Sequence, residues 1–117
     1  MSSIVRSVMI FAPEPKVVAQ WWADFLGLSD DVVSVEENFA YFDVGGIEFG
    51  FHPADERRNP IGGSPVVYLR VDDHASSLAR AESRGARVHR GPLRIGPSRT
   101  IAQLVDPFGT VFGLDGP

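Results

Sequence analysis

Glu48 and His52 are the two side chains in this sequence best placed for acid–base chemistry. Residues 47–51 alternate in polarity as a β-strand does, so Glu48, Gly50 and His52 share one face of that strand. A carboxylate and an imidazole arranged in this way can share a proton and act as acid and base. Two simpler interpretations stay open: Glu48 forms an ion pair with Arg70 across a sheet, or His52 is only a solvated residue at the end of its strand.

Other ionisable residues carry weaker indications of function. His74 and His89 fall at the edges of a predicted helix and a predicted strand, where we expect them on the surface. Arg94 and Arg99 lie in the stretch GPLRIGPSR, which resembles a loop that borders the ligand cleft in a known protein superfamily. These two arginines either hold an anionic group or keep an edge strand soluble.

Composition indicates one globular domain. The chain has 117 residues, of which 44% are hydrophobic and 22% charged, enough to bury a single core. The net charge of -4, without a block of Lys and Arg, argues against nucleic acid as a partner. There is no cysteine, which excludes disulfides and thiolate metal sites.

Nothing in the hydropathy pattern indicates a membrane protein. No apolar run approaches the roughly 18 residues of a membrane span, and the first residues lack the basic and apolar regions of a secretory signal. We therefore expect a soluble, cytoplasmic protein that binds neither membrane nor nucleic acid.

The first half of the chain predicts a strand, a helix and a group of strands. A strand is expected over residues 4–11. The apolar residues of 17–26 recur at helical spacing, with Trp21 and Trp22 expected as core and flank, and Gly27 ends this helix. Strands over 39–44 and 47–51 flank a Gly45-Gly46 turn. A weaker strand fits residues 32–35.

The second half repeats this order after a polar connection over residues 53–65, which is rich in Pro and Gly. A strand over 66–71, a helix over 75–84, a strand from Arg87 and a hairpin over 104–114 follow, with a positive φ expected at Gly109. Residues 1–52 and 66–117 thus form two modules of similar pattern, and the fold class is α+β.

The stretches SVMIFAPEPKVVAQWWADFLGL, VVYLRVDDHASSLARAESRGARV and LVDPFGTVFGL resemble the vicinal oxygen chelate superfamily. That group contains glyoxalase I, extradiol dioxygenases, fosfomycin-resistance enzymes and bleomycin-binding proteins. The resemblance covers nearly the whole chain. It implies a single domain of two βαβββ modules, with curled mixed sheets around a cleft, and it commonly implies a homodimer.

The same resemblance places the metal ligands of the superfamily on Ser7, Glu48, Val66 and Gly113 of this chain. Only Glu48 offers a strong donor there, and one carboxylate with a serine hydroxyl cannot hold a divalent ion well. We therefore expect the fold without its metal site, and no cofactor.

Strand alternation predicts which residues line the cleft instead. One face of the strands is expected to point toward the helices: Val8, Ile10, Ile47, Phe49, Val67, Leu69, Phe112 and Leu114. The opposite face would form the ligand-binding cleft: Ser7, Met9, Phe11, Glu48, Gly50, His52, Val66, Tyr68, Arg70, Gln103 and Gly113. This mixture of aromatic, flexible and polar groups is typical of a small-molecule pocket.

Three functions remain open at this stage. The first is a metal-free protein that sequesters an aromatic or amphipathic compound, as in drug resistance, with Met9, Phe11 and Tyr68 for stacking and Glu48 facing a cationic group. The second is a lyase, isomerase or dioxygenase with no metal, or with one held by Glu48 and His52. The third is a module that scaffolds a partner protein.

Overall fold

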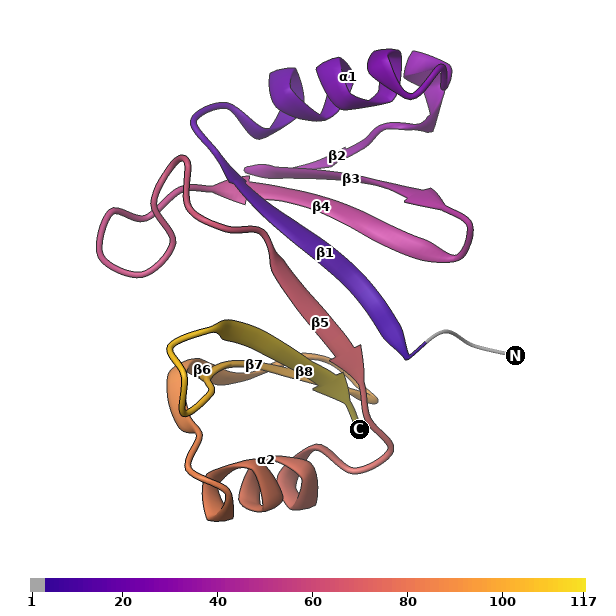
Figure 1. The fold of residues 1–117 in the computed structure, drawn as a ribbon. Helices are drawn as coiled ribbons and strands as arrows, with labels where there is room; N and C mark the ends of the chain where they lie inside the picture. The colour runs from indigo at the N-terminus through magenta and orange to yellow at the C-terminus, as the bar shows by residue number, and fades with distance from the viewer. Residues whose placement is uncertain (1–3) are drawn as a thin grey trace. The chain divides into compact units, whose positions relative to one another are not determined.

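The structure is a computed structural model that describes residues 4–117, except for the side chain of Asp30. Two βαβββ modules follow one another along the chain (Figure 1). The first contains β1 (Val5–Ala12), α1 (Pro15–Phe25), a 3-10 turn η1 (Asp30–Val32), β2 (Ser34–Glu36), β3 (Phe39–Val44) and β4 (Ile47–Pro53). The second contains β5 (Val66–Arg70), α2 (His74–Ser83), β6 (Arg87–Gly96), β7 (Arg99–Val105) and β8 (Val111–Gly116).

Backbone contacts divide the chain into two compact units, which are described separately below. The N-terminal unit comprises residues 7–65. The C-terminal unit comprises residues 66–117 together with the first described residues, 4–6. Ile4 joins this unit because its carbonyl accepts a hydrogen bond of 2.7 Å from the amide of Arg70.

The sheet of the N-terminal unit has the strand order β2-β3-β4-β1. β1 pairs with β4 in parallel, and the other two pairs are antiparallel. Gly45 and Gly46 have φ values of 58° and 84°, the left-handed conformation that a tight two-residue hairpin requires. This hairpin fixes the register of β3 on β4, so that Asp43 lies opposite Glu48 and Tyr41 opposite Gly50.

Helix α1 packs one face on this sheet. It begins with Pro15, a favoured first residue, and ends where Gly27 takes a φ of 76° and the amide of Leu28 donates to the carbonyl of Ala23 at 2.8 Å. The fully buried Ala19 and Ala23 allow the helix to approach closely. They form the core of the unit with three sheet residues, Ala40, Phe42 and Phe51, and with Trp22 at the edge.

The C-terminal unit repeats the topology with the order β5-β8-β7-β6, in which only β5 and β8 are parallel. Asp73 caps α2 by accepting a hydrogen bond from the amide of Ser76 at 3.1 Å, and Gly85 follows the helix with a φ of 99°. Leu104, Leu114 and Ala102 form the core beneath this helix.

The hairpin between β7 and β8 is held by Asp106. Its Oδ1 accepts hydrogen bonds from the amides of Phe108 at 2.8 Å and Thr110 at 2.9 Å. The bond from Thr110 is the main cause that keeps the pKa of the Asp106 carboxyl below its ordinary value. Gly109 has a φ of 96°, which confirms the expected positive φ.

The predicted fold class and most predicted elements are confirmed. The two modules have mixed sheets with one helix each, and the first strand, both hairpins and both helices lie where the sequence places them, to within a few residues. Several strand residues that were expected to point toward the helices do pack in the cores. They are Ile10 and Phe49 in one unit and Leu69, Phe112 and Leu114 in the other. Val67 is an exception, because it is 39% exposed and takes no part in the core.

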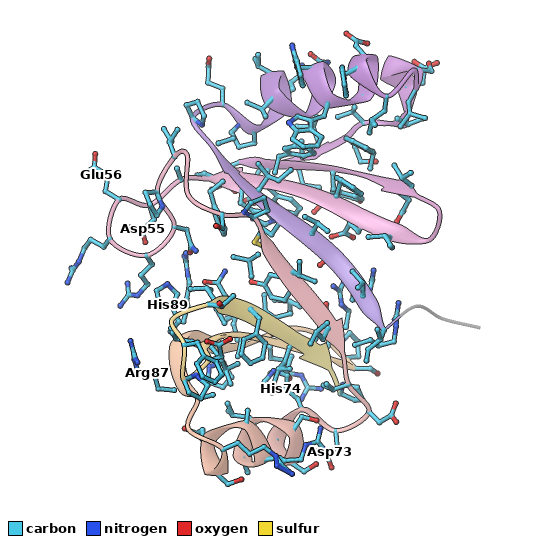
Figure 2. All side chains as sticks on the ribbon, in the orientation of Figure 1. Asp55, Glu56, Asp73, His74, Arg87 and His89 are labelled. Carbon is cyan, nitrogen blue, oxygen red and sulfur yellow. The ribbon has the colours of Figure 1, made fainter. Side chains whose placement is uncertain are left out.

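Three local expectations need correction. Residues 91–96, predicted to belong to a loop, continue β6, because they pair with β7 across several register shifts. The 53–65 connection is not wholly irregular, since Asp55 and Asn59 form a small bridge with two hydrogen bonds of 2.8 Å. His74 is buried rather than on the surface; as the first residue of α2, it lies between this helix and the sheet of its unit (Figure 2).

Among the described residues, neither helix has the length and apolar character needed to cross a membrane.

Candidate functional site

The predicted site residues of the N-terminal unit lie side by side on one face of its sheet. Strand register places Ser7 beside Glu48, Met9 beside Gly50 and Phe11 beside His52. β3 extends the first two rows with Asp43 and Tyr41. One end of this face is acidic, with Glu48 and Asp43. Gly50 lies in the middle, and Phe11 and His52 make the other end aromatic.

Gly50 forms the floor of this face. A Cβ built on Gly50 would lie 3.6 Å from Nε2 of His52 and 3.9 Å from Oε2 of Glu48, so these two groups approach one point from opposite directions. Both side chains are half-buried, and Gly50 itself is buried. The structure therefore brings together the acid and the base that the sequence singled out, over a position that has no side chain of its own.

The aromatic part of the face is larger than the sequence analysis predicted. The ring of Phe39 stacks on the imidazole of His52, with centroids 4.7 Å apart and planes inclined by 8°. Tyr41 lies next to Phe39 on the same strand face, at 6.0 Å between centroids. Neither aromatic residue was predicted, although counting back from the Gly45-Gly46 turn identifies Tyr41 as the partner of Gly50.

The predicted site residues of the C-terminal unit gather around Tyr68. Tyr68 and Gln103 flank Gly113 in register on β5 and β7. The Tyr68 ring covers Gly113 so closely that an added Cβ would collide with it, lying 2.6 Å from Cγ and Cε2. Gly113 therefore serves to admit the tyrosine ring and does not leave an open space.

Tyr68 and Gln103 form a buried polar pair. Each is 3% exposed, and Nε2 of Gln103 donates to the Tyr68 hydroxyl at 3.0 Å. Burial raises the pKa of Tyr68 above 10.0, although the Gln103 hydrogen bond and the positive charge of Arg90 act in the opposite direction. Within the described part of the chain, Oε1 of Gln103 has no hydrogen-bond partner.

Arg90 is a further polar residue of this unit that sequence reasoning missed. It lies opposite Gln103 in register, and its charge acts on Tyr68. The register of β6 on β7 shifts on both sides of Arg90, so alternation along β6 does not reveal which face this residue occupies.

The remaining predicted residues have different surroundings. Val66 is buried and Arg70 is exposed. Arg99 is held by Asp115, through hydrogen bonds of 3.2 Å from Nε and 2.6 Å from Nη2. Glu48 and Arg70 belong to different units, so their ion pair stays a prediction.

The residues at the expected metal positions do not fit a metal ion. Ser7 and Glu48 supply one hydroxyl and one carboxylate, whereas Val66 and Gly113 have no side-chain donor, and divalent ions require several converging donors. Within residues 4–117, no group of three or more His, Asp or Glu side chains is placed to hold an ion.

The paired βαβββ modules, together with a sequence match to the glyoxalase-like domain, place the chain in the vicinal oxygen chelate superfamily. The sequence profile of the glyoxalase-like domain matches residues 7–114, and the chain belongs to this family. No curated protein matches the sequence significantly.

Solved structures with the same fold are only distantly related in sequence. A methylmalonyl-CoA epimerase in complex with methylmalonyl-CoA and NH4+ is 16% identical, with a TM-score of 0.70 over 98% of this chain and 94% of its own. A variant of the Streptomyces coelicolor methylmalonyl-CoA epimerase, in complex with 2-nitronate-propionyl-CoA, is 16% identical with a TM-score of 0.69 over 98% and 94%. A structure described as an NAD-dependent benzaldehyde dehydrogenase from Legionella pneumophila is 13% identical, with a TM-score of 0.66 over 93% and 96%. These similarities establish the fold alone.

Proposed function

We propose that this protein binds a small aromatic cation without a metal ion, on the sheet face of the N-terminal unit. The packing of Tyr68 on Gly113 carries the metal-free part of the proposal. The Tyr68 ring covers Gly113, a position that the superfamily resemblance assigns to a metal ligand, and a side chain there would collide with the ring. Without a metal ion, the ligand would be held by side chains alone.

The N-terminal face supports an aromatic ligand. Phe39, Tyr41 and His52 present ring surfaces, and the thioether of Met9 adapts to irregular shapes. Gly50, between Met9 and Tyr41, has no side chain to keep a flat molecule away from the sheet. A planar ring stacked here would replace solvent on the half-buried aromatic groups.

The charge of the unit supports a cationic ligand. Glu48 and Asp43 lie opposite each other at one end of the face. Residues 7–65 contain ten acidic and only three basic side chains, so the field of this unit attracts cations. Because rows two residues apart along a strand are separated by about 7 Å, a ring over Gly50 places a substituent of modest length beside Glu48.

Two dyes with the same ring system but different charge test this proposal. Proflavine is a planar aromatic cation, whereas acridine is mostly neutral at neutral pH. We expect saturable proflavine binding in a fluorescence titration, unchanged by EDTA or by added zinc, nickel or manganese, and weaker binding of acridine. Loss of proflavine binding in EDTA, or no binding of either dye, contradicts the proposal.

Variants of two site residues sharpen this test. Glu48→Gln should weaken proflavine binding by about tenfold, equivalent to roughly 1.4 kcal/mol, with little effect on acridine. Gly50→Leu should abolish binding of both dyes, because the new side chain fills the space between His52 and Glu48. A Cβ at Gly50 makes only ordinary contacts, so Gly50→Ala should remain folded. Gly96→Leu, in a strand of the other unit, is the matched control and should bind normally.

A second candidate function is proton transfer at an activated carbon atom, as in an isomerase or lyase. The convergence of Glu48 and His52 over Gly50 favours it, since one group can remove a proton while the other returns one. Methylmalonyl-CoA, which the structurally similar epimerase binds, is a suitable first substrate to test. Deuterium uptake from D2O into methylmalonyl-CoA, followed by mass spectrometry and lost in Glu48→Gln, would support this function over simple binding.

A further inference from the structure

Three arginines lie close together where α2 leads into β6. Arg80 and Arg84 stand at the end of the helix, Arg87 begins the strand, and all three are exposed. Figure 2 shows the side chain of Arg87 extending away from its strand. Among the described residues, none of these three guanidinium groups forms an ion pair. Their charges therefore face solvent without a carboxylate partner from the chain.

The turn between α2 and β6 packs against the hairpin between β7 and β8. A Cβ added to Gly85, the residue after Arg84, would lie 3.1 Å from Cγ of Pro107 in this hairpin. Arg87 pairs in register with Val105, just before the hairpin turn. Arg84 and Arg87 therefore lie beside the hairpin.

Phe108 adds an apolar group to the same surface. It follows Pro107 in the hairpin turn and is 91% exposed. Its backbone is held in place, because Oδ1 of Asp106 accepts a hydrogen bond from the Phe108 amide at 2.8 Å. A side chain on such a fixed turn loses little conformational freedom when a partner covers it. Arginine and aromatic side chains are also enriched in protein interfaces.

The charge of the C-terminal unit favours an acidic partner. Residues 4–6 and 66–117 contain eight basic and five acidic side chains, although the whole chain has a net charge of -4. All eight basic residues are arginines, whose planar guanidinium group can bind a carboxylate through two hydrogen bonds. Glu82 and Asp106 are the carboxylates nearest to the three arginines in the chain or in the hairpin, and Oδ1 of Asp106 already accepts hydrogen bonds from two amides.

We propose that Arg80, Arg84, Arg87 and Phe108 form a surface that binds a flexible acidic segment of a partner protein. Carboxylates of the segment pair with the guanidinium groups, and an aromatic or large apolar side chain of the segment covers Phe108. Nucleic acid fits less well, because the net charge of -4 repels a long polyanion, whereas a short segment contacts this surface alone. This inference is independent of the aromatic site in the N-terminal unit.

Fluorescence anisotropy with labelled peptides tests the inference. The probe is a short peptide of Asp and Glu with one central Phe. One matched peptide replaces the Phe with Ser, and another replaces every acidic residue with Asn or Gln. We expect saturable binding of the probe in the micromolar range, several-fold weaker binding of the Ser peptide and no measurable binding of the amide peptide. High NaCl should weaken binding of the probe about tenfold, because salt screens exposed charges.

Variants of the protein locate the binding surface. Arg84→Gln combined with Arg87→Gln should weaken binding of the acidic peptide about tenfold, and Phe108→Ser should weaken it several-fold. Arg57→Gln combined with Arg58→Gln removes two exposed positive charges from the other unit and is the matched control, which should bind normally. Circular dichroism and thermal unfolding show whether each variant remains folded.

Several results would overturn the proposal. Equal weakening by the two double variants would mean that the peptide responds only to net charge. No binding of the acidic peptide, or equal binding of the acidic and amide peptides, would exclude recognition of carboxylates. Tighter binding of single-stranded DNA than of the acidic peptide would identify nucleic acid as the partner instead.

Discussion

The ring of Tyr68 covers the backbone of Gly113, its register partner on the neighbouring strand β8, and leaves no room for a Cβ at that position. One contact thus joins a buried tyrosine to Gly113, where the superfamily resemblance places a metal ligand. The glycine is required by the ring, and the ring in turn closes the position that would carry the ligand. The two residues should be energetically coupled.

Gly113→Ala is expected to destabilise the protein by about 1–3 kcal/mol, the usual range for an overpacked core. The new methyl group meets the Tyr68 ring, which cannot withdraw easily because Gln103 holds its hydroxyl. Urea unfolding measures the loss. In Tyr68→Ala the same glycine substitution should cost much less, and additive effects of the two changes would contradict the contact.

Tyr68→Ala itself should destabilise the fold by about 3–5 kcal/mol, because the side chain is almost fully buried. If Tyr68 instead served chiefly to stack on a ligand, its removal would change the free energy of unfolding much less. Calorimetric or urea unfolding decides between the two. An unchanged midpoint of unfolding would show that the ring does not belong to the core of its unit.

Alkaline pH should reveal the burial of Tyr68. Its pKa in the folded protein is raised above 10.0, so the folded protein holds the phenol proton more tightly than the unfolded chain does. The stability from this difference is complete below the unfolded-state pKa and is lost as the pH rises through the folded-state pKa. Tyr68→Phe should have a flatter decline of stability in this range, measured by urea unfolding at a series of pH values. Identical slopes for the two proteins would rule out a buried, titrating phenol.

The Arg99–Asp115 pair should be necessary for stability but replaceable. Asp115 is 3% exposed, and Arg99 neutralises it with two hydrogen bonds. Arg99→Leu should cost about 3 kcal/mol, because it leaves a buried carboxylate without a partner. The double variant Arg99→Leu with Asp115→Leu should recover much of this loss in thermal unfolding, and a double variant as unstable as the single one would contradict this reasoning.

The hairpin turn before β8 should depend on one glycine. Gly109 has a φ of 96° with open space around it, so Gly109→Ala costs only the backbone strain of a left-handed residue, about 1–2 kcal/mol. Gly96→Ala is the control, since its φ is not in that region and its nearest neighbour is 3.9 Å away. Urea midpoints for both variants should differ accordingly. Equal effects would mean that the turn tolerates other conformations.

Local sequence signals were sufficient for most of the architecture. The four-residue recurrence of apolar side chains fixed α1, Gly27 ended it, and Gly45-Gly46 set a two-residue hairpin whose register follows by counting. These features depend on residues close together in the chain, so their physics can be read from the sequence. The same alternation correctly separated the helix-facing residues Phe49 and Leu69 from the opposite face.

Only the tertiary structure shows which side chains are buried and which residues contact each other. The sequence predicted Gly113 to line a ligand-binding cleft, yet the space above it is occupied by the ring of Tyr68, a residue 45 positions earlier in the chain. His74 was predicted to be exposed but is buried within its own unit, and Arg90, which lies between two register shifts of β6, was not predicted to act on Tyr68. In a regular strand the sequence predicts which face a residue occupies, because alternation is local. Which residue fills a given volume depends on long-range strand pairing, and only the folded chain provides that information.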